Sequence, residues 1–147
     1  MSTARSSIIQ LGLLATLVAC RDPSGLADRV DFDVAPLAVQ TDPRVIAYRF
    51  EVSNRSAAPV WMLTCDQRVT PDIAFVVSGR TVDTMRGDLC NALGDNSPIS
   101  LAPGQSYSGE RAVMHQAGVR YVPSLTVGSE RSFDRSARLQ AIAFTAP

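Results

Sequence analysis

Apolar and polar residues alternate strictly over residues 46–53. The apolar set is Ile46, Tyr48, Phe50 and Val52, and the residues between them are small, polar or charged. Successive side chains of a β-strand point to opposite faces, so this pattern predicts a strand with one face in the core and the other in water. No ten-residue stretch after residue 20 shows a clear 3.6-residue apolar period. The chain is therefore expected to fold as an all-β protein.

Further strands are predicted where short apolar runs lie between turn-forming residues. The run at residues 60–65 is apolar at both parities, so we expect it to be central in its sheet. Pro103-Gly104 fits the middle of a type II turn, because glycine accepts the positive φ needed there. With seven or eight strands, the sequence predicts one two-sheet antiparallel β-sandwich over residues 30–147. The expected strands besides 46–53 are 30–34, 60–65, 73–77, 80–85, 106–114, 121–127 and 137–145.

The first twenty residues have the organisation of an export signal. Arg5 gives a positive start, residues 8–19 are mostly apolar, and the small residue Ala19 precedes Cys20. The run is too short for a bilayer, which needs about 20 apolar residues. Leu17-Val18-Ala19-Cys20 resembles the lipobox of bacterial lipoproteins. This resemblance implies a cleaved signal peptide (1–19), a lipidated Cys20 and a short polar tether (20–29). The alternative is an ordinary signal peptide with a chance cysteine.

Lipidation of Cys20 would anchor the mature protein to a membrane of the bacterial cell envelope, since several acyl chains suffice for stable binding. In Gram-negative lipoproteins, an aspartate directly after the cysteine favours retention in the inner membrane. Arg21 occupies that position here, so the resemblance implies the outer membrane, with the protein facing the periplasm.

Cys65 and Cys90 remain as a pair once Cys20 is assigned to lipid. In an exported protein, such a pair predicts a disulfide. It would close a loop of about 26 residues and contribute roughly 3 to 4 kcal/mol. A redox-active or metal-binding pair is the alternative, although the Cys-x-x-Cys spacing is absent.

Three turn and strand signals resemble bacterial immunoglobulin-like envelope domains: Asn54-x-Ser56 after one strand, Cys65 at the end of the next, and Leu101-Ala102-Pro103-Gly104-Gln105 before a later one. The resemblance implies an immunoglobulin-like sandwich. Antibody domains place Cys, Trp and Cys on three core strands, whereas here Trp61 and Cys65 share a strand and Cys90 lies in a loop. The disulfide is therefore expected to pin that loop.

Charge and residue content argue against several function classes. The 14 basic and 14 acidic residues balance, so no basic excess supports binding of nucleic acid. His115 is the only histidine, which is too few for a copper centre. Ser106 lacks the glycine pattern of a nucleophile elbow, and Asp31 and Asp33 are explained by exposure. The oxygen-rich residues Asp88, Asn91, Asp95 and Asn96 do not match an EF-hand. No catalytic residue, metal or cofactor is predicted.

The resulting hypothesis is a non-catalytic binding or scaffolding lipoprotein with a protein partner. Loops 86–100 and 128–135 are its expected contact surfaces, because a rigid scaffold displays them. Arg86-Gly87-Asp88 also spells an integrin-recognition tripeptide, which would suggest adhesion. Two alternatives remain: a proteinase inhibitor, because the strand and Pro-Gly pattern resembles small bacterial inhibitors, and an enzyme of unknown type.

Overall fold

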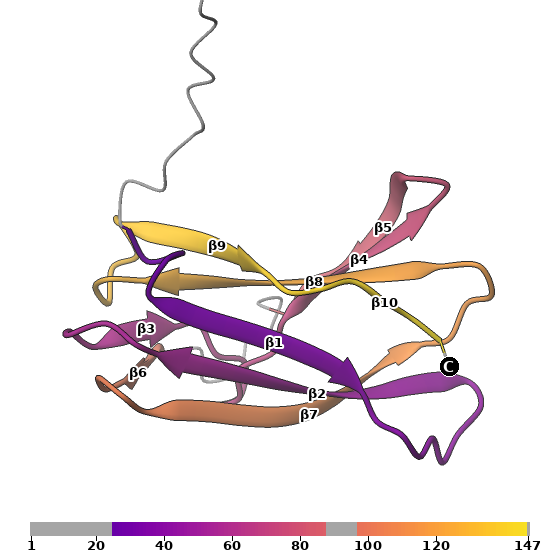
Figure 1. Ribbon diagram of the computed structural model, residues 1–147, viewed down its shortest axis with the longest axis horizontal. Helices are drawn as coiled ribbons and strands as arrows, with labels where there is room; N and C mark the ends of the chain where they lie inside the picture. Colours follow the sequence, from indigo (N-terminus) through magenta and orange to yellow (C-terminus); the bar gives the residue numbers. More distant parts are fainter. Residues whose placement is uncertain (1–24, 88–96, 147) are drawn as a thin grey trace, which may run out of the picture.

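The computed structural model describes residues 25–87 and 97–146, and this part of the chain forms ten β-strands (Figure 1). Within these residues, no helix is long and apolar enough to cross a bilayer. The strands are β1 (Val30–Pro36), β2 (Val45–Asn54), β3 (Val60–Met62), β4 (Asp72–Val77), β5 (Arg80–Met85), β6 (Ile99–Leu101), β7 (Ser106–Met114), β8 (Arg120–Gly128), β9 (Ser136–Gln140) and β10 (Phe144–Thr145).

The strands form two antiparallel sheets that pack as a sandwich. The smaller sheet has the order β1-β2-β7. In the larger sheet β8 is central: β3 and β4 pair with it, as do β9 and β10. Strand β5 extends this sheet beyond β4, and β6 extends it beyond β3. The predicted all-β, two-sheet sandwich is therefore confirmed.

Several boundaries differ from those expected. The 60–65 strand ends at Met62, because the chain leaves the sheet there and rejoins it at Asp72. The 137–145 strand is two strands, separated by residues 141–143. Residues 99–101 form an additional short strand, β6. Leu26 is buried in the core, so the packed fold includes a residue that was expected to lie in the tether.

The core lies between the sheets and is built from alternate residues, as the period-2 pattern of β2 predicts. Ile46, Tyr48, Phe50 and Val52 are all at most 2% exposed, whereas Arg49 and Glu51 are exposed. Tyr48 of the small sheet packs against Phe144 of the large sheet, with ring centres 5.9 Å apart, and Phe144 in turn stacks on Tyr121 of the neighbouring strand at 5.3 Å. Burial of such rings contributes most to cores of this kind.

Tyr121 closes the connection between β7 and β8. Its ring is fully buried near the start of β8, while its hydroxyl donates to the Met114 carbonyl at 3.0 Å and accepts the Gln116 N–H at 2.8 Å. A tyrosine early in this strand, bonded to the backbone a few residues upstream, is the tyrosine corner of immunoglobulin-like sandwiches. This feature places β7, the edge strand of the small sheet, relative to the centre of the large one.

Tyr121→Phe is expected to lower the free energy of unfolding by about 1 to 3 kcal/mol, because it removes two hydrogen bonds, to the Gln116 N–H and the Met114 carbonyl, that are partly shielded from water. Tyr48→Phe is the matched control. The Tyr48 hydroxyl is buried without a hydrogen-bond partner among the described residues, and burial raises the pKa of its phenol to about 12. Removal of the Tyr48 hydroxyl should leave the free energy of unfolding, measured with urea, unchanged or raise it. Equal losses for the two variants would contradict the assigned roles.

Candidate functional site

The sandwich is open between two edge strands that belong to opposite sheets. Strand β7 ends the small sheet and β5 ends the large one, and the β3–β4 connection (residues 63–71) lies between them. The described residues form an open cleft here of about 650 Å³, which we call the edge cleft. Its lining residues are Cys65, Asp66, Arg68, Thr70, Met85, Arg86, Gly87, Glu110 and Arg111.

A tight turn forms one wall of the edge cleft. Cys65 and Arg68 exchange two backbone hydrogen bonds, of 2.9 and 3.0 Å. Asp66 and Gln67 between them have positive φ values of 51° and 61°, which is the conformation of a type I′ turn. Buried residues hold both ends, since the Thr64 hydroxyl donates to the Ser97 carbonyl and Val69 is fully buried. The turn therefore presents its exposed side chains from a rigid base.

Arg111 forms the floor of the edge cleft. Its guanidinium donates to the Val69 carbonyl at 2.7 Å, to the Thr70 hydroxyl at 3.1 Å and to the Glu110 carbonyl at 2.7 Å. It also lies 5.9 Å from the centre of the Phe50 ring, a favourable place for a cation. All these partners are neutral, so they orient the guanidinium without cancelling its charge.

The balance of charge in the edge cleft is positive. The Glu110 carboxylate pairs with Arg49 on the outer face of the small sheet. Among the described residues, no carboxylate forms an ion pair with Arg68 or Arg111, while Asp66 supplies one negative charge. An anionic group from a partner would therefore find two guanidiniums without carboxylate partners.

Gly87 fastens the start of loop 86–100 to the large sheet. Its N–H donates to one oxygen of Asp72 at 2.8 Å, and Arg138 on β9 donates to the other oxygen at 2.8 Å.

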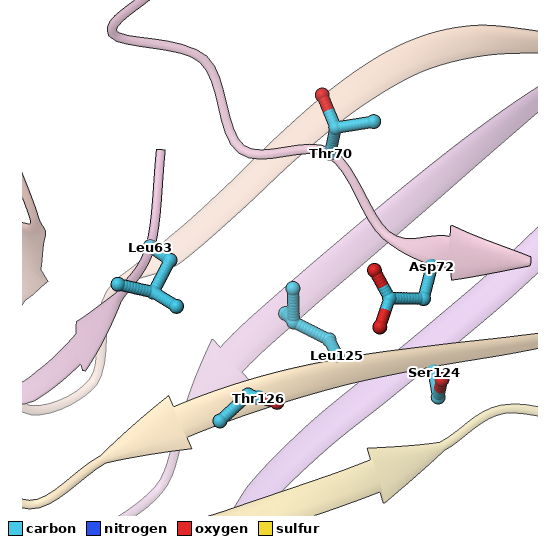
Figure 2. Close-up of a pocket in the computed structure, with 6 residues that line it drawn as sticks. All are labelled: Leu63, Thr70, Asp72, Ser124, Leu125 and Thr126. Atoms are coloured by element: carbon cyan, nitrogen blue, oxygen red, sulfur yellow. The ribbon is translucent and has the colours of Figure 1, made fainter. Parts of the chain in front are cut away.

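Asp72 also borders a cavity of about 20 Å³, which lies where the β3–β4 connection departs from β8 (Figure 2). In Figure 2, Leu63 and Asp72 come from the separating segments, and Leu125 belongs to β8. The cavity has room for about one water molecule, which is too little for a metabolite.

The predicted cysteine sites are only partly described. Cys20 and Cys90 lie outside the described residues, as do Asp88, Asn91, Asp95 and Asn96. Cys65 lies at the base of the tight turn, so its pairing with Cys90 stays a prediction. Within the described residues, no group of three or more histidine, cysteine or acidic side chains could hold a metal ion.

Of the tripeptide Arg86-Gly87-Asp88, only Arg86 and Gly87 belong to the described residues. Gly87 is buried, and a Cβ on it would lie 1.9 Å from the Thr70 carbonyl oxygen. The adhesion hypothesis depends on all three residues, so it stays a prediction. In loop 128–135, by contrast, Glu130, Arg131 and Asp134 are exposed as expected, and a backbone bond of 2.9 Å between Ser129 and Arg135 closes the loop.

The residues considered for catalysis lie far apart. His115 follows the last residue of β7, is exposed, and has its Nδ1 3.1 Å from the Pro43 carbonyl oxygen. Ser106 begins the same strand, and its hydroxyl lies 2.7 Å from that of Ser53. A strand rises about 3.3 Å per residue, so ~30 Å separate the two side chains. His115 cannot act as the base for Ser106.

Two of the three arginines that line the edge cleft, Arg68 and Arg111, were not predicted from the sequence, whereas Arg86 belongs to the expected contact loop 86–100. Arg111 did carry a signal, because it shares the inward parity of Tyr107 and Val113 on β7. A charged residue at a core position indicates either an edge that must be protected or a site. Arg68 carried no signal, since its position in the edge cleft depends on the path of the β3–β4 connection.

Comparison with known proteins supports the fold and nothing finer. No family model and no curated protein matches the sequence. The chain is similar to a Bordetella pertussis structure described as an ApaA protein, with a TM-score of 0.55, 16% identity, and coverage of 80% of this chain and 94% of that one. It is similar to the structural-genomics target SoR45, with a TM-score of 0.52, 14% identity, and coverage of 83% and 90%. For the PapD-like domain 7 of human CEP192 the TM-score is 0.38 at 13% identity, over the full length of both chains, too low to carry an argument. The first two likenesses and the tyrosine corner show a small immunoglobulin-like β-sandwich.

Proposed function

We propose that this protein is a non-catalytic binding module of the bacterial cell envelope, held by lipid on Cys20 and recognising a protein partner through the edge cleft. The observation that carries the proposal is the pair Arg68 and Arg111, two guanidiniums that form no ion pair with a carboxylate of residues 25–87 or 97–146, in a cleft built on a rigid frame. Unpaired charges in a preformed concave surface give specificity and steer association.

The position of the edge cleft agrees with this role. The strand that follows the tether, β1, belongs to one edge of the small sheet, and β7 forms the opposite edge. If residues 20–29 anchor the module to the outer membrane, β1 is the strand nearest the anchor. The edge cleft then lies at the opposite edge of the small sheet. A partner in the periplasm could then reach the edge cleft from the side.

Arg68→Glu is expected to reduce the yield of the crosslinked partner about tenfold, because it reverses a charge in the edge cleft. The measurement is in-cell crosslinking of the full lipidated protein followed by mass spectrometry. Arg131→Glu makes the same chemical change at an exposed arginine on loop 128–135 and should leave the yield unchanged. If Arg131→Glu alone reduced the yield, the contact surface would be loop 128–135 and the edge-cleft proposal would fall.

Lipidation is tested separately from binding. Cells labelled with radioactive palmitate should incorporate it into the wild-type protein and not into Cys20→Ser, because the thiol is the acylation site that the lipobox implies. The wild type should fractionate with the outer membrane, and the variant should be soluble or retained as a precursor. Incorporation of label into Cys20→Ser would show that the lipobox interpretation is wrong.

A further inference from the structure

The outer edge of β7 carries backbone groups that no other strand uses. Asn54 in β2 donates to Gln105 and accepts from Gly104, so its N–H and C=O face β7. Backbone groups alternate in direction along a strand, and in the register Val52 opposes Tyr107 and Phe50 opposes Gly109. The odd residues of β7 therefore bond β2, and its even residues direct their N–H and C=O groups away from the sheet.

Three of these even residues form an open backbone ladder. Strand β7 pairs only with β2 among the described strands. Ser108, Glu110 and Ala112 are all exposed, and their N–H groups have no acceptor among the residues that the structure describes. Two carbonyls on this edge do have donors: the Arg111 side chain donates to the Glu110 carbonyl, and the Tyr121 hydroxyl donates to the Met114 carbonyl. An inward-directed charge of this kind protects an edge from indiscriminate pairing.

We propose that the partner contributes an extended segment with an acidic side chain, which adds to the small sheet as a strand beside β7. This inference rests on the proposed function and names the chemistry of its partner. Strand addition to an exposed edge gains affinity from backbone hydrogen bonds and specificity from pockets for alternate side chains. The edge cleft supplies the pocket, since Glu110 and Arg111 belong both to it and to the edge.

The charge of the edge cleft and the alternation of side chains along a strand together determine which side chains the added strand should have. Every second side chain of the added strand points to the side of Arg111, where Arg68 also lies and forms no ion pair with a carboxylate in the part of the chain that the structure describes. An aspartate or glutamate at such a position would form a charge-assisted hydrogen bond. The intervening side chains would lie on the outer face beside Ala112 and Met114, the latter 59% exposed, where apolar groups are favoured.

Ser108→Pro tests the strand addition directly. Proline removes the unpaired N–H and bars a neighbouring strand, yet takes no hydrogen bond from the β2–β7 ladder. Ser108→Ala removes the same side chain and keeps the N–H. The probe is a phage-displayed library of random dodecapeptides, selected on the wild-type folded domain. Circular dichroism and thermal unfolding check each variant, and Ala112→Pro serves in place of Ser108→Pro if that variant does not fold.

The selected peptides are expected to contain Asp or Glu and to bind Ser108→Ala within twofold of the wild type. Affinity should fall at least tenfold for Ser108→Pro and for Arg68→Glu, and the bound peptide should protect the Ser108, Glu110 and Ala112 amides from hydrogen exchange. Equal binding to Ser108→Pro and the wild type overturns the proposal. A wild-type dimer that Ser108→Pro converts to a monomer also overturns it, because a second copy would then occupy the edge.

The crosslinking result distinguishes a failure of strand addition from a failure of the proposed function. Partner capture that depends on Arg68 but persists in Ser108→Pro leaves the edge cleft as the binding surface and removes strand addition. Capture that is indifferent to Arg68 removes the proposed function itself.

Discussion

Gly87→Ala is expected to destabilise the fold by about 3 kcal/mol, the upper part of the range for forcing atoms into a packed site. A Cβ on Gly87 would lie 1.9 Å from the Thr70 carbonyl oxygen, 2.6 Å from its carbonyl carbon and 2.9 Å from the Pro71 oxygen. All three atoms belong to backbone, so no side-chain rotation relieves the contact. The chain at Gly87 must move away, which also breaks its hydrogen bond to Asp72. For a domain of this size, the midpoint of thermal unfolding should fall by about 10 °C.

Gly79→Ala is the matched control for this prediction. Gly79 lies in the turn between β4 and β5 with a φ of +79° and with nothing within 4 Å of an added Cβ. Its substitution introduces only backbone strain, of about 1 kcal/mol. Urea unfolding of both variants gives the comparison. A loss at Gly87 no larger than that at Gly79 would mean that the start of loop 86–100 is not packed against the β3–β4 connection.

Asn54→Ala is expected to lower the free energy of unfolding by about 3 kcal/mol, because one side chain satisfies several buried backbone groups at once. Asn54 is 1% exposed. Its amide nitrogen donates to the Ala58 and Leu101 carbonyls at 2.9 Å each, and its oxygen accepts from the N–H and the hydroxyl of Ser56. Alanine would remove the side-chain partner of the Leu101 carbonyl and of the Ser56 N–H and loosen the end of β6, although the Ser56 hydroxyl could still donate to the Ala58 carbonyl. This loss should appear in urea unfolding.

Ser53→Ala is the neighbouring control. The Ser53 hydroxyl bonds that of Ser106 on the exposed face of the small sheet, where water can replace a lost partner, so its removal should cost less than 1 kcal/mol. Comparable stability of Asn54→Ala and Ser53→Ala would refute this account.

Local chemistry accounts for the parts of the fold that were predicted. The alternation in β2, the turn at Pro103-Gly104 and the turn at Ser78-Gly79 between the expected strands 73–77 and 80–85 depend on residues within a few positions of one another. Ser78 and Gly79 have positive φ values of 49° and 79°. Gly104 has φ +74°, and Gln105 N–H donates to the Ala102 carbonyl at 3.1 Å, as a type II turn requires. β2 also ends at Asn54, as the Asn54-x-Ser56 signal predicts. The Asn54 side chain is buried there and bonds the backbone of Ser56, Ala58 and Leu101.

The strand boundaries that were predicted wrongly depend on which strands pair with each other. Residues 60–65 are apolar throughout, yet β3 ends at Met62, because Leu63 and Thr64 lie where the chain departs to form the tight turn. Residues 137–145 break at 141–143 because β9 and β10 pair with separate parts of β8. Apolar periodicity predicts neither the end of β3 nor the break at residues 141–143, because it indicates which side chains are buried and not which strands pair.

The sequence by itself determined the class of the fold, the faces of its strands and several of its turns, because each depends on side chains close together in the chain. It also carries the lipobox resemblance and the expected disulfide, which depend on residue identity. The tertiary structure alone decided which edges stay open. Arg68 and Arg111 are 43 positions apart in the numbering, and they share a cleft only because the β3–β4 connection crosses beneath β7. Such a site is produced by long-range strand pairing, which fixes relative positions that no local pattern records.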